Sequence, residues 1–255
     1  MDSFVNALAR AQDKIWSHND EPAPQPPPHH LAVVNQAIAL KPQHLRSNRI
    51  VAFDGGDKTA RAFDVLRNTC LKDLVSRMTG RTVFGVTSPG RGAGVSTIAA
   101  NMAFSLARLQ KGAVVLADLA PSGEGLQQRL GLNIADVENR LRRDALLPLQ
   151  ASGITIYFAN LLPFIEGKSG DEIRVAIRDW AASVGSELAP VNIVLDLPPL
   201  LHDDRTAPFV AEVDMLVMAL AAGKSTLAEL ETCKSYLHEA GKVQLVLNKA
   251  RHYDL

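Results

Sequence analysis

A glycine-rich segment, Ser88–Thr97, has the residue types of a loop that binds phosphate. It follows an apolar run at Val83–Val86 and precedes Ile98–Ala107, which has the composition of a helix. Backbone N–H groups of such a loop and the positive end of the following helix converge on an anion. The usual loop ends in Gly-Lys-Ser/Thr, but Val95 stands in the place of the lysine. The expected phosphate-binding residues are Gly90, Arg91, Gly92, Ala93, Gly94, Val95, Ser96 and Thr97.

Two aspartates close apolar segments further along the chain. Asp118 follows Val114–Ala117, and Asp196 follows Ile193–Leu195. A carboxylate at the end of a buried strand can hold the hydrated Mg²⁺ of a bound nucleotide, directly or through water. One such residue alone is better explained as a helix cap or turn former, but two of them after a glycine loop favour a nucleotide site. We therefore predict Asp118 and Asp196 as catalytic carboxylates and, with Ser96, as Mg²⁺ ligands.

Short apolar strands and helices alternate around these residues. The expected strands lie at 83–86, 114–117, 154–158, 193–195, 215–219 and 243–247, and the expected helices at 60–78, 96–109, 171–184 and 225–240. Such an alternation is typical of a parallel sheet covered on both faces. Right-handed crossovers then bring the loops at the carboxyl ends of the strands to one edge. The sequence predicts an α/β, P-loop-type three-layer fold with a mainly parallel central sheet and helices on both faces.

The N-terminal part differs in composition from the rest. Residues 1–17 carry apolar side chains at helical spacing, and Glu21–His30 is a proline-rich spacer of the polyproline type. A docking peptide for a partner and a helix that frays or packs back on its own domain explain this pattern equally well. We expect an N-terminal helix plus Pro-rich linker over 1–48 and a P-loop domain over 49–255.

The charge balance and the cysteines argue against several classes of protein. Lys and Arg number 27, and Asp and Glu number 27, so the net charge is zero and nucleic acid is not expected as a partner. Cys70 and Cys233 lack Cys-x-x-Cys spacing and are expected to be reduced thiols that are semi-buried or in the core. No secretory signal pattern begins the sequence, and no run approaches the ~18 apolar residues of a membrane-spanning helix. We expect a cytoplasmic protein without membrane insertion.

The order of the motifs resembles the deviant Walker A group of ATPases. It is most similar to the cytoplasmic domain of bacterial tyrosine kinases (BY-kinases of the CpsD/CapB type), which serve capsule and exopolysaccharide export. The resemblance runs from about Ile50 to Ala250 and includes Phe63–Arg67, Ser96–Asn101, Asp196–Pro199, Gly223–Thr226 and Val246–Lys249. Partition and septum-placement ATPases share the fold, but the Pro-Pro pair after Asp196 favours the kinase-like branch. The resemblance implies ATP or ADP with Mg²⁺ as ligand, with Asn248 either at the adenine edge or in a plain turn.

Several residues depart from the BY-kinase pattern. Val95 removes a charge-assisted phosphate contact worth roughly 1.5–3 kcal/mol, which predicts weak nucleotide binding and impaired phosphoryl transfer. Gly90 stands at the family's additional lysine, with Arg91 adjacent, and Ala120 stands at the second aspartate of its next motif. The family's terminal tyrosine cluster is reduced to Tyr253, which is the phosphosite candidate. The resemblance therefore implies an inactive or impaired protein-tyrosine kinase or ATPase.

The helix ahead of the loop departs from the family in its charges. BY-kinases use a Glu-x-x-Arg-x-x-Arg pattern there for ring formation, and the matching positions are Arg61, Asp64 and Arg67. Two of the three have inverted charge, which would oppose a self-made ring and could complement a different subunit. The plain structural explanation is an exposed i,i+3 pair of Arg61 and Asp64. These residues are the expected interface of a hetero- or homo-oligomer.

Together these features predict a BY-kinase-like pseudokinase that regulates or assembles exopolysaccharide or capsule synthesis and export, with weak or no ATP hydrolysis. Its expected partner is the cytoplasmic part of a membrane polysaccharide co-polymerase (Wzc/Wzz-like), which would recruit it to the inner membrane. One alternative is an active P-loop ATPase or tyrosine autokinase in which Arg91 or a partner's basic residue replaces the lysine. A partition- or positioning-type ATPase is the other alternative.

Overall fold

The computed structural model describes residues 32–34, 36–74, 80–119, 125–133 and 145–250. The expected N-terminal helix, the proline-rich spacer, Ala120 and Tyr253 lie outside these ranges. Within them, no helix combines the length and the apolar character that crossing a bilayer requires.

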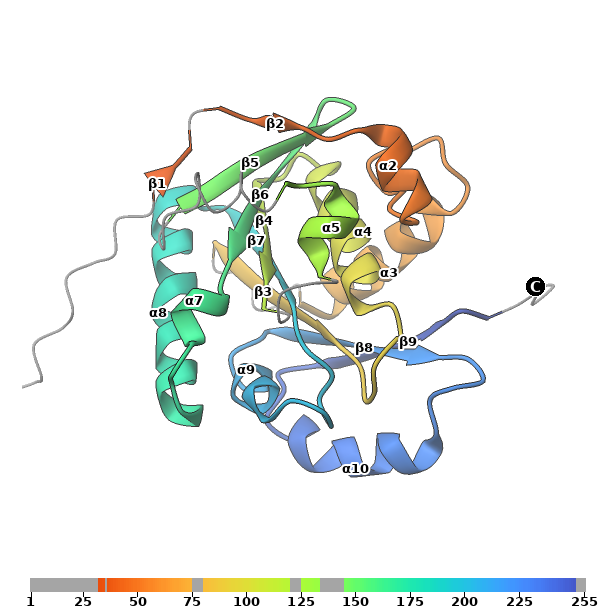
Figure 1. The fold of residues 1–255 in the computed structure, drawn as a ribbon, viewed down its shortest axis with the longest axis vertical. Helices are drawn as coiled ribbons and strands as arrows, with labels where there is room; N and C mark the ends of the chain where they lie inside the picture. The colour runs from red at the N-terminus through yellow and green to blue at the C-terminus, as the bar shows by residue number, and fades with distance from the viewer. Residues whose placement is uncertain (1–31, 35, 75–79, 120–124, 134–144, 251–255) are drawn as a thin grey trace, which may run out of the picture.

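A mixed sheet of nine strands forms the centre of the molecule (Figure 1). The strands are β1 (Ala32–Val33), β2 (Ile38–Ala39), β3 (Arg81–Thr87), β4 (Ala113–Asp118), β5 (Ala145–Ala151), β6 (Ile154–Asn160), β7 (Val191–Asp196), β8 (Met215–Ala221) and β9 (Val243–Asn248). They follow the spatial order β1-β5-β6-β4-β7-β3-β8-β9, and β2 also pairs with β5. Every strand pair is parallel except β5 with β6.

Helices cover both faces of this sheet (Figure 1). They are α2 (Pro42–Ser47), α3 (Ala60–Leu74), α4 (Val95–Ala107), α5 (Leu126–Leu130), α7 (Leu162–Ile165), α8 (Gly170–Leu188), α9 (Ala207–Val210) and α10 (Leu227–Leu237), with a 3-10 turn at Asp204–Thr206. Apolar side chains of α3, α4 and α5 form one buried cluster, and those of α7 to α10 form a second on the opposite face. This arrangement confirms the three-layer fold that the sequence predicts.

The folded domain begins ahead of the boundary expected between residues 48 and 49. Both β1 and β2 pair with β5, and Leu45 of α2 is fully buried. Residues 32–34 and 36–48 are therefore joined to the sheet and the core of the fold. Strands of two residues are too short to show a periodicity, and Pro148 inside β5 is a residue that argues against a strand in sequence analysis.

Candidate phosphate-binding site

The glycine loop lies between β3 and α4, as the sequence predicts. Gly94 precedes the helix with φ +90°, a left-handed conformation that glycine adopts without strain. Ile98 N donates to Gly94 O at 3.0 Å and closes the first helical turn. The backbone N–H groups of that turn have no partner inside the helix, and with the helix dipole they favour an anion at the loop.

Two side chains from distant parts of the sheet edge anchor the loop. Asn248, at the end of β9, donates from Nδ2 to Ala93 O at 2.7 Å and accepts at Oδ1 from Lys249 N at 2.8 Å. Lys224 donates from Nζ to Arg91 O at 2.7 Å. Both ends of the Asn248 amide are therefore bonded within the chain, and this side chain fastens the glycine loop to the end of β9.

The predicted metal ligands come together at the carboxyl ends of two neighbouring strands. Asp118 of β4 and Asp196 of β7 are register partners, and both are buried, at 4% and 1% exposure. Ser96, on the first turn of α4, lines the same pocket as Asp196, and its hydroxyl lowers the pKa of the Asp196 carboxyl. The sheet register and the loop thus place all three side chains at one point.

The electrostatics of this point suit a cation. Burial raises the pKa of Asp196 well above its ordinary value, and the neighbouring Asp118 raises it further, against the lowering effects of Ser96 and Arg129. The Oδ2 atom of Asp196 is buried and has no hydrogen-bond partner among the described residues. Such a carboxylate oxygen fits a hard divalent cation such as Mg²⁺. No third His, Cys, Asp or Glu joins the pair within the described ranges, so phosphate oxygens or water would complete the coordination.

A pocket of about 270 Å³ opens beside the loop. Its walls include the loop, Asp196, Pro198 and Arg129 of α5. Val95 also lines it, but this side chain is half-buried and packs against the core on the α3–α4 face. Sequence analysis did not single out Arg129 for the site, since nothing in the spacing of α5 marks it and only the packing of α5 against α4 brings it there.

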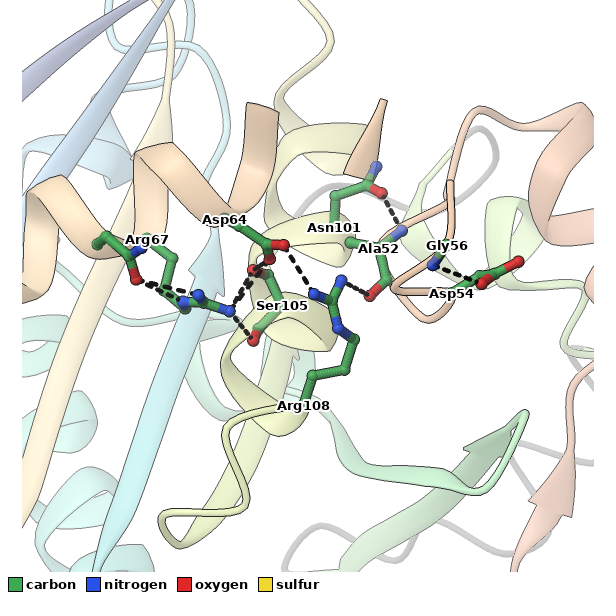
Figure 2. Close-up of polar contacts among 9 residues, drawn as sticks. Ala52, Asp54, Gly56, Asp64, Arg67, Asn101, Ser105 and Arg108 are labelled. Atoms are coloured by element: carbon green, nitrogen blue, oxygen red, sulfur yellow. Dashed lines mark hydrogen bonds and ion pairs between the residues drawn. The ribbon is translucent and has the colours of Figure 1, made fainter. Parts of the chain in front are cut away.

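The three residues expected at an oligomer interface have different surroundings (Figure 2). Arg67 is only 6% exposed and donates from Nη1 to Ser105 O at 2.7 Å and to Asp64 Oδ1 at 3.1 Å. Asp64 also accepts from Arg108 Nη2 at 2.7 Å, and its ion pairs within the described residues are with Arg67 and Arg108 and not with Arg61, the partner in the plain structural explanation. Arg61 alone of the three is exposed. The carboxylate of Asp64 on α3 binds Ser105 of α4 and Arg108 at the end of that helix, and so joins the two helices.

Replacing Asp196 by Asn is expected to raise the stability of the protein purified without nucleotide or Mg²⁺. The substitution removes a carboxyl whose ionisation is opposed by burial and by Asp118, so the free energy of unfolding at pH 7 should rise by about 1–2 kcal/mol, as at other functional sites with unfavourable electrostatics. Urea denaturation measures it. Asp203→Asn is the control, and it should lower the free energy of unfolding. The Asp203 carboxylate is stabilised by Arg205, which donates to it at 2.6 and 2.8 Å. A loss of stability in Asp196→Asn would contradict the electrostatic picture.

Comparison with known proteins places the fold. No protein-family model matches the chain, and no curated protein matches it with significance. The kinase domain of Escherichia coli tyrosine kinase ETK superposes with a TM-score of 0.59 at 14% identity, over 81% of this chain and 82% of that one. The chimerical protein CapA2B2 superposes with a TM-score of 0.62 at 16% identity, over 87% of this chain and 94% of that one. The BceF tyrosine kinase domain superposes with a TM-score of 0.59 at 15% identity, over 87% of this chain and 95% of that one. The chain has the P-loop fold of bacterial tyrosine kinase domains.

Proposed function

We propose that this chain, which has the fold of bacterial tyrosine kinase domains, is a BY-kinase-like pseudokinase. It binds ATP or ADP with Mg²⁺ and hydrolyses or transfers the γ-phosphate slowly or not at all. Val95 carries this proposal. The glycine loop, Ser96, Asp118 and Asp196 are assembled, yet the position of the catalytic lysine holds a half-buried valine that packs against the core.

The chemistry follows from what these groups can do. The loop amides and the first turn of α4 bind phosphate oxygens by hydrogen bonds. Asp118, Asp196 and Ser96 would hold Mg²⁺, which when bound neutralises phosphate charge. Valine has neither a donor nor a charge for the oxygens that become more negative as the γ-phosphate departs, and such stabilisation is usually the largest part of catalysis. Binding therefore survives better than turnover.

The cellular role that we propose is regulation or assembly of exopolysaccharide or capsule synthesis and export. Its support is the resemblance of the motifs to BY-kinases together with the shared fold. The partner would be the cytoplasmic segments of a membrane polysaccharide co-polymerase, which would bring a cytoplasmic protein to the inner membrane. Arg61, exposed on α3, offers a positive charge to an acidic side chain of such a partner.

Calorimetric titration and a phosphate-release assay test the proposal together. We expect saturable binding of ATP and ADP that tightens with Mg²⁺, and phosphate release no faster than in Asp196→Ala. Mass spectrometry after incubation with ATP should find no phosphate on Tyr253. Rapid Mg²⁺-dependent turnover abolished in Asp196→Ala would establish an active ATPase instead, and absence of nucleotide binding would also overturn the proposal.

A further inference from the structure

Arg129 has an unusual environment for an arginine. It lies on α5, lines the pocket of the glycine loop, and has a buried Nε atom without a hydrogen-bond partner among the described residues. Its Nη1 atom is 3.5 Å from Thr97 Oγ1 on the first turn of α4, at the outer limit of a hydrogen bond. Buried donors nearly always have acceptors, because leaving one unpaired costs free energy. The described part of the chain thus offers this guanidinium fewer acceptors than it has N–H donors.

The position of Arg129 is held by the part of the chain that the sequence assigns to the linker. His44 Nε2 of α2 hydrogen-bonds to Gln128 O at 2.9 Å. Gly131 ends α5 with φ +73°, and a Cβ atom there would lie 2.8 Å from His44 Cδ2. The close approach of α2 therefore requires glycine at that position. A short helix fixed in this way holds its arginine in place ahead of any ligand.

Arg91 is the competing source of positive charge. It is adjacent to the family's additional lysine position, but its side chain is exposed and its positive charge acts on Asp203. Arg129 is half-buried, and its charge acts on Asp196 at the carboxyl end of β7. Charge is worth more where water is excluded, so Arg129 is the better placed of the two.

We propose that Arg129 supplies from α5 the phosphate-binding charge that Val95 removes from the loop. This inference rests on the proposed nucleotide binding and names the residue behind it. The ligand class is the polyphosphate part of a nucleoside di- or triphosphate, because a guanidinium can bind two phosphate oxygens at once. Arg129 thus acts as a binding residue and explains how a loop without its lysine keeps affinity for nucleotide.

A double-mutant cycle between positions 95 and 129 tests this inference. Calorimetry with ADP, and separately with inorganic tripolyphosphate, would compare the wild type, Arg129→Gln, Val95→Lys and the double variant. We expect Arg129→Gln to weaken binding of both ligands about 10- to 100-fold, the range for one charge-assisted phosphate contact. In the Val95→Lys background the same change should cost less than about threefold, because the loop then carries its own charge.

Controls separate charge from folding. Arg174→Gln removes a positive charge from the exposed surface of α8 and should leave both affinities within about twofold. Thermal melts show whether each variant is folded, and Arg129→Met, which keeps the apolar stem, replaces Arg129→Gln if the latter unfolds.

Each outcome decides between the two proposals. Unchanged affinities in a folded Arg129→Gln, a larger loss in Arg91→Gln, or an equal loss in the Val95→Lys background would overturn the role of Arg129 and leave nucleotide binding standing. Arg129-dependent binding of tripolyphosphate without binding of ATP or ADP would overturn the proposed function and keep the arginine site. A wild type that binds neither ligand would overturn both.

Discussion

Asp64→Ala will lower the free energy of unfolding by about 3–4 kcal/mol, the cost of leaving a buried charge without its partner. Asp64 is the only acidic residue that the described structure places against Arg67 and Arg108 (Figure 2). Its Oδ1 atom also accepts from Ser105 Oγ at 2.6 Å. Without the carboxylate, Arg67 keeps its charge at 6% exposure with only neutral acceptors.

The same carboxylate gives the effect a pH signature. Burial opposes ionisation of Asp64, but hydrogen bonds from Ser105 and Arg108, together with the positive charges of Arg108 and Arg67, outweigh it and hold the pKa below its ordinary value. A lowered pKa in the folded state stabilises the protein above the ordinary pKa of about 3.9, and that contribution is lost as the pH falls through the lowered value. The stability difference between the wild type and Asp64→Asn should therefore be constant near neutral pH and shrink below pH ~4.

Urea denaturation at several pH values measures both effects. Glu231→Ala is the matched control, since Glu231 accepts from Lys234 at 2.7 Å in an exposed i,i+3 pair on α10 and should contribute less than about 0.5 kcal/mol. A loss in Asp64→Ala no larger than in the control would show that the network is not the source of stability. Such a result would return Asp64 and Arg67 to consideration as interface residues.

Asn101→Leu will cost about 3–5 kcal/mol, although the two side chains have nearly the same volume. Asn101 is fully buried on α4, and its Oδ1 atom accepts from Val51 N at 2.8 Å. The same atom accepts from Ala52 N at 2.9 Å (Figure 2). Its Nδ2 atom donates to Arg49 O at 2.9 Å and to Thr97 O at 2.8 Å. Leucine leaves two backbone N–H groups buried without acceptors, each costing about 1–3 kcal/mol.

The loss should reach the phosphate site as well. Asn101 ties the segment before α3 to the helix whose first turn carries Ser96 and Thr97, so nucleotide affinity is expected to fall along with stability. Thermal unfolding and ADP titration of the same preparation measure the two effects. Gln128→Leu, on the exposed surface of α5, is the control for a polar-to-apolar change. Stability within about 0.5 kcal/mol of the wild type in Asn101→Leu would contradict the assignment of these hydrogen bonds.

The sequence by itself determined the elements that have a local cause. The glycine loop could be found because Gly94 needs a left-handed backbone at the start of α4, and strands such as β3 and β4 because each contains a continuous apolar run. Asp118 and Asp196 could be predicted as neighbours because both end parallel strands, whose carboxyl ends share one edge. The alternation of apolar strands and helices along the chain predicted the fold class, because such an alternation is typical of a parallel sheet covered by helices.

Only the tertiary structure decided which polar groups meet. Asn248 bonds the loop across 155 residues of sequence, Lys224 across 133, and Arg67 contacts Ser105 across 38. The strands β1 and β2 gain their hydrogen bonds from β5, and α5 brings Arg129 into the pocket. Local propensity and periodicity carry no information about such contacts, because the partner of a charge or of a hydrogen-bond donor is fixed by the packing of the helices against the sheet.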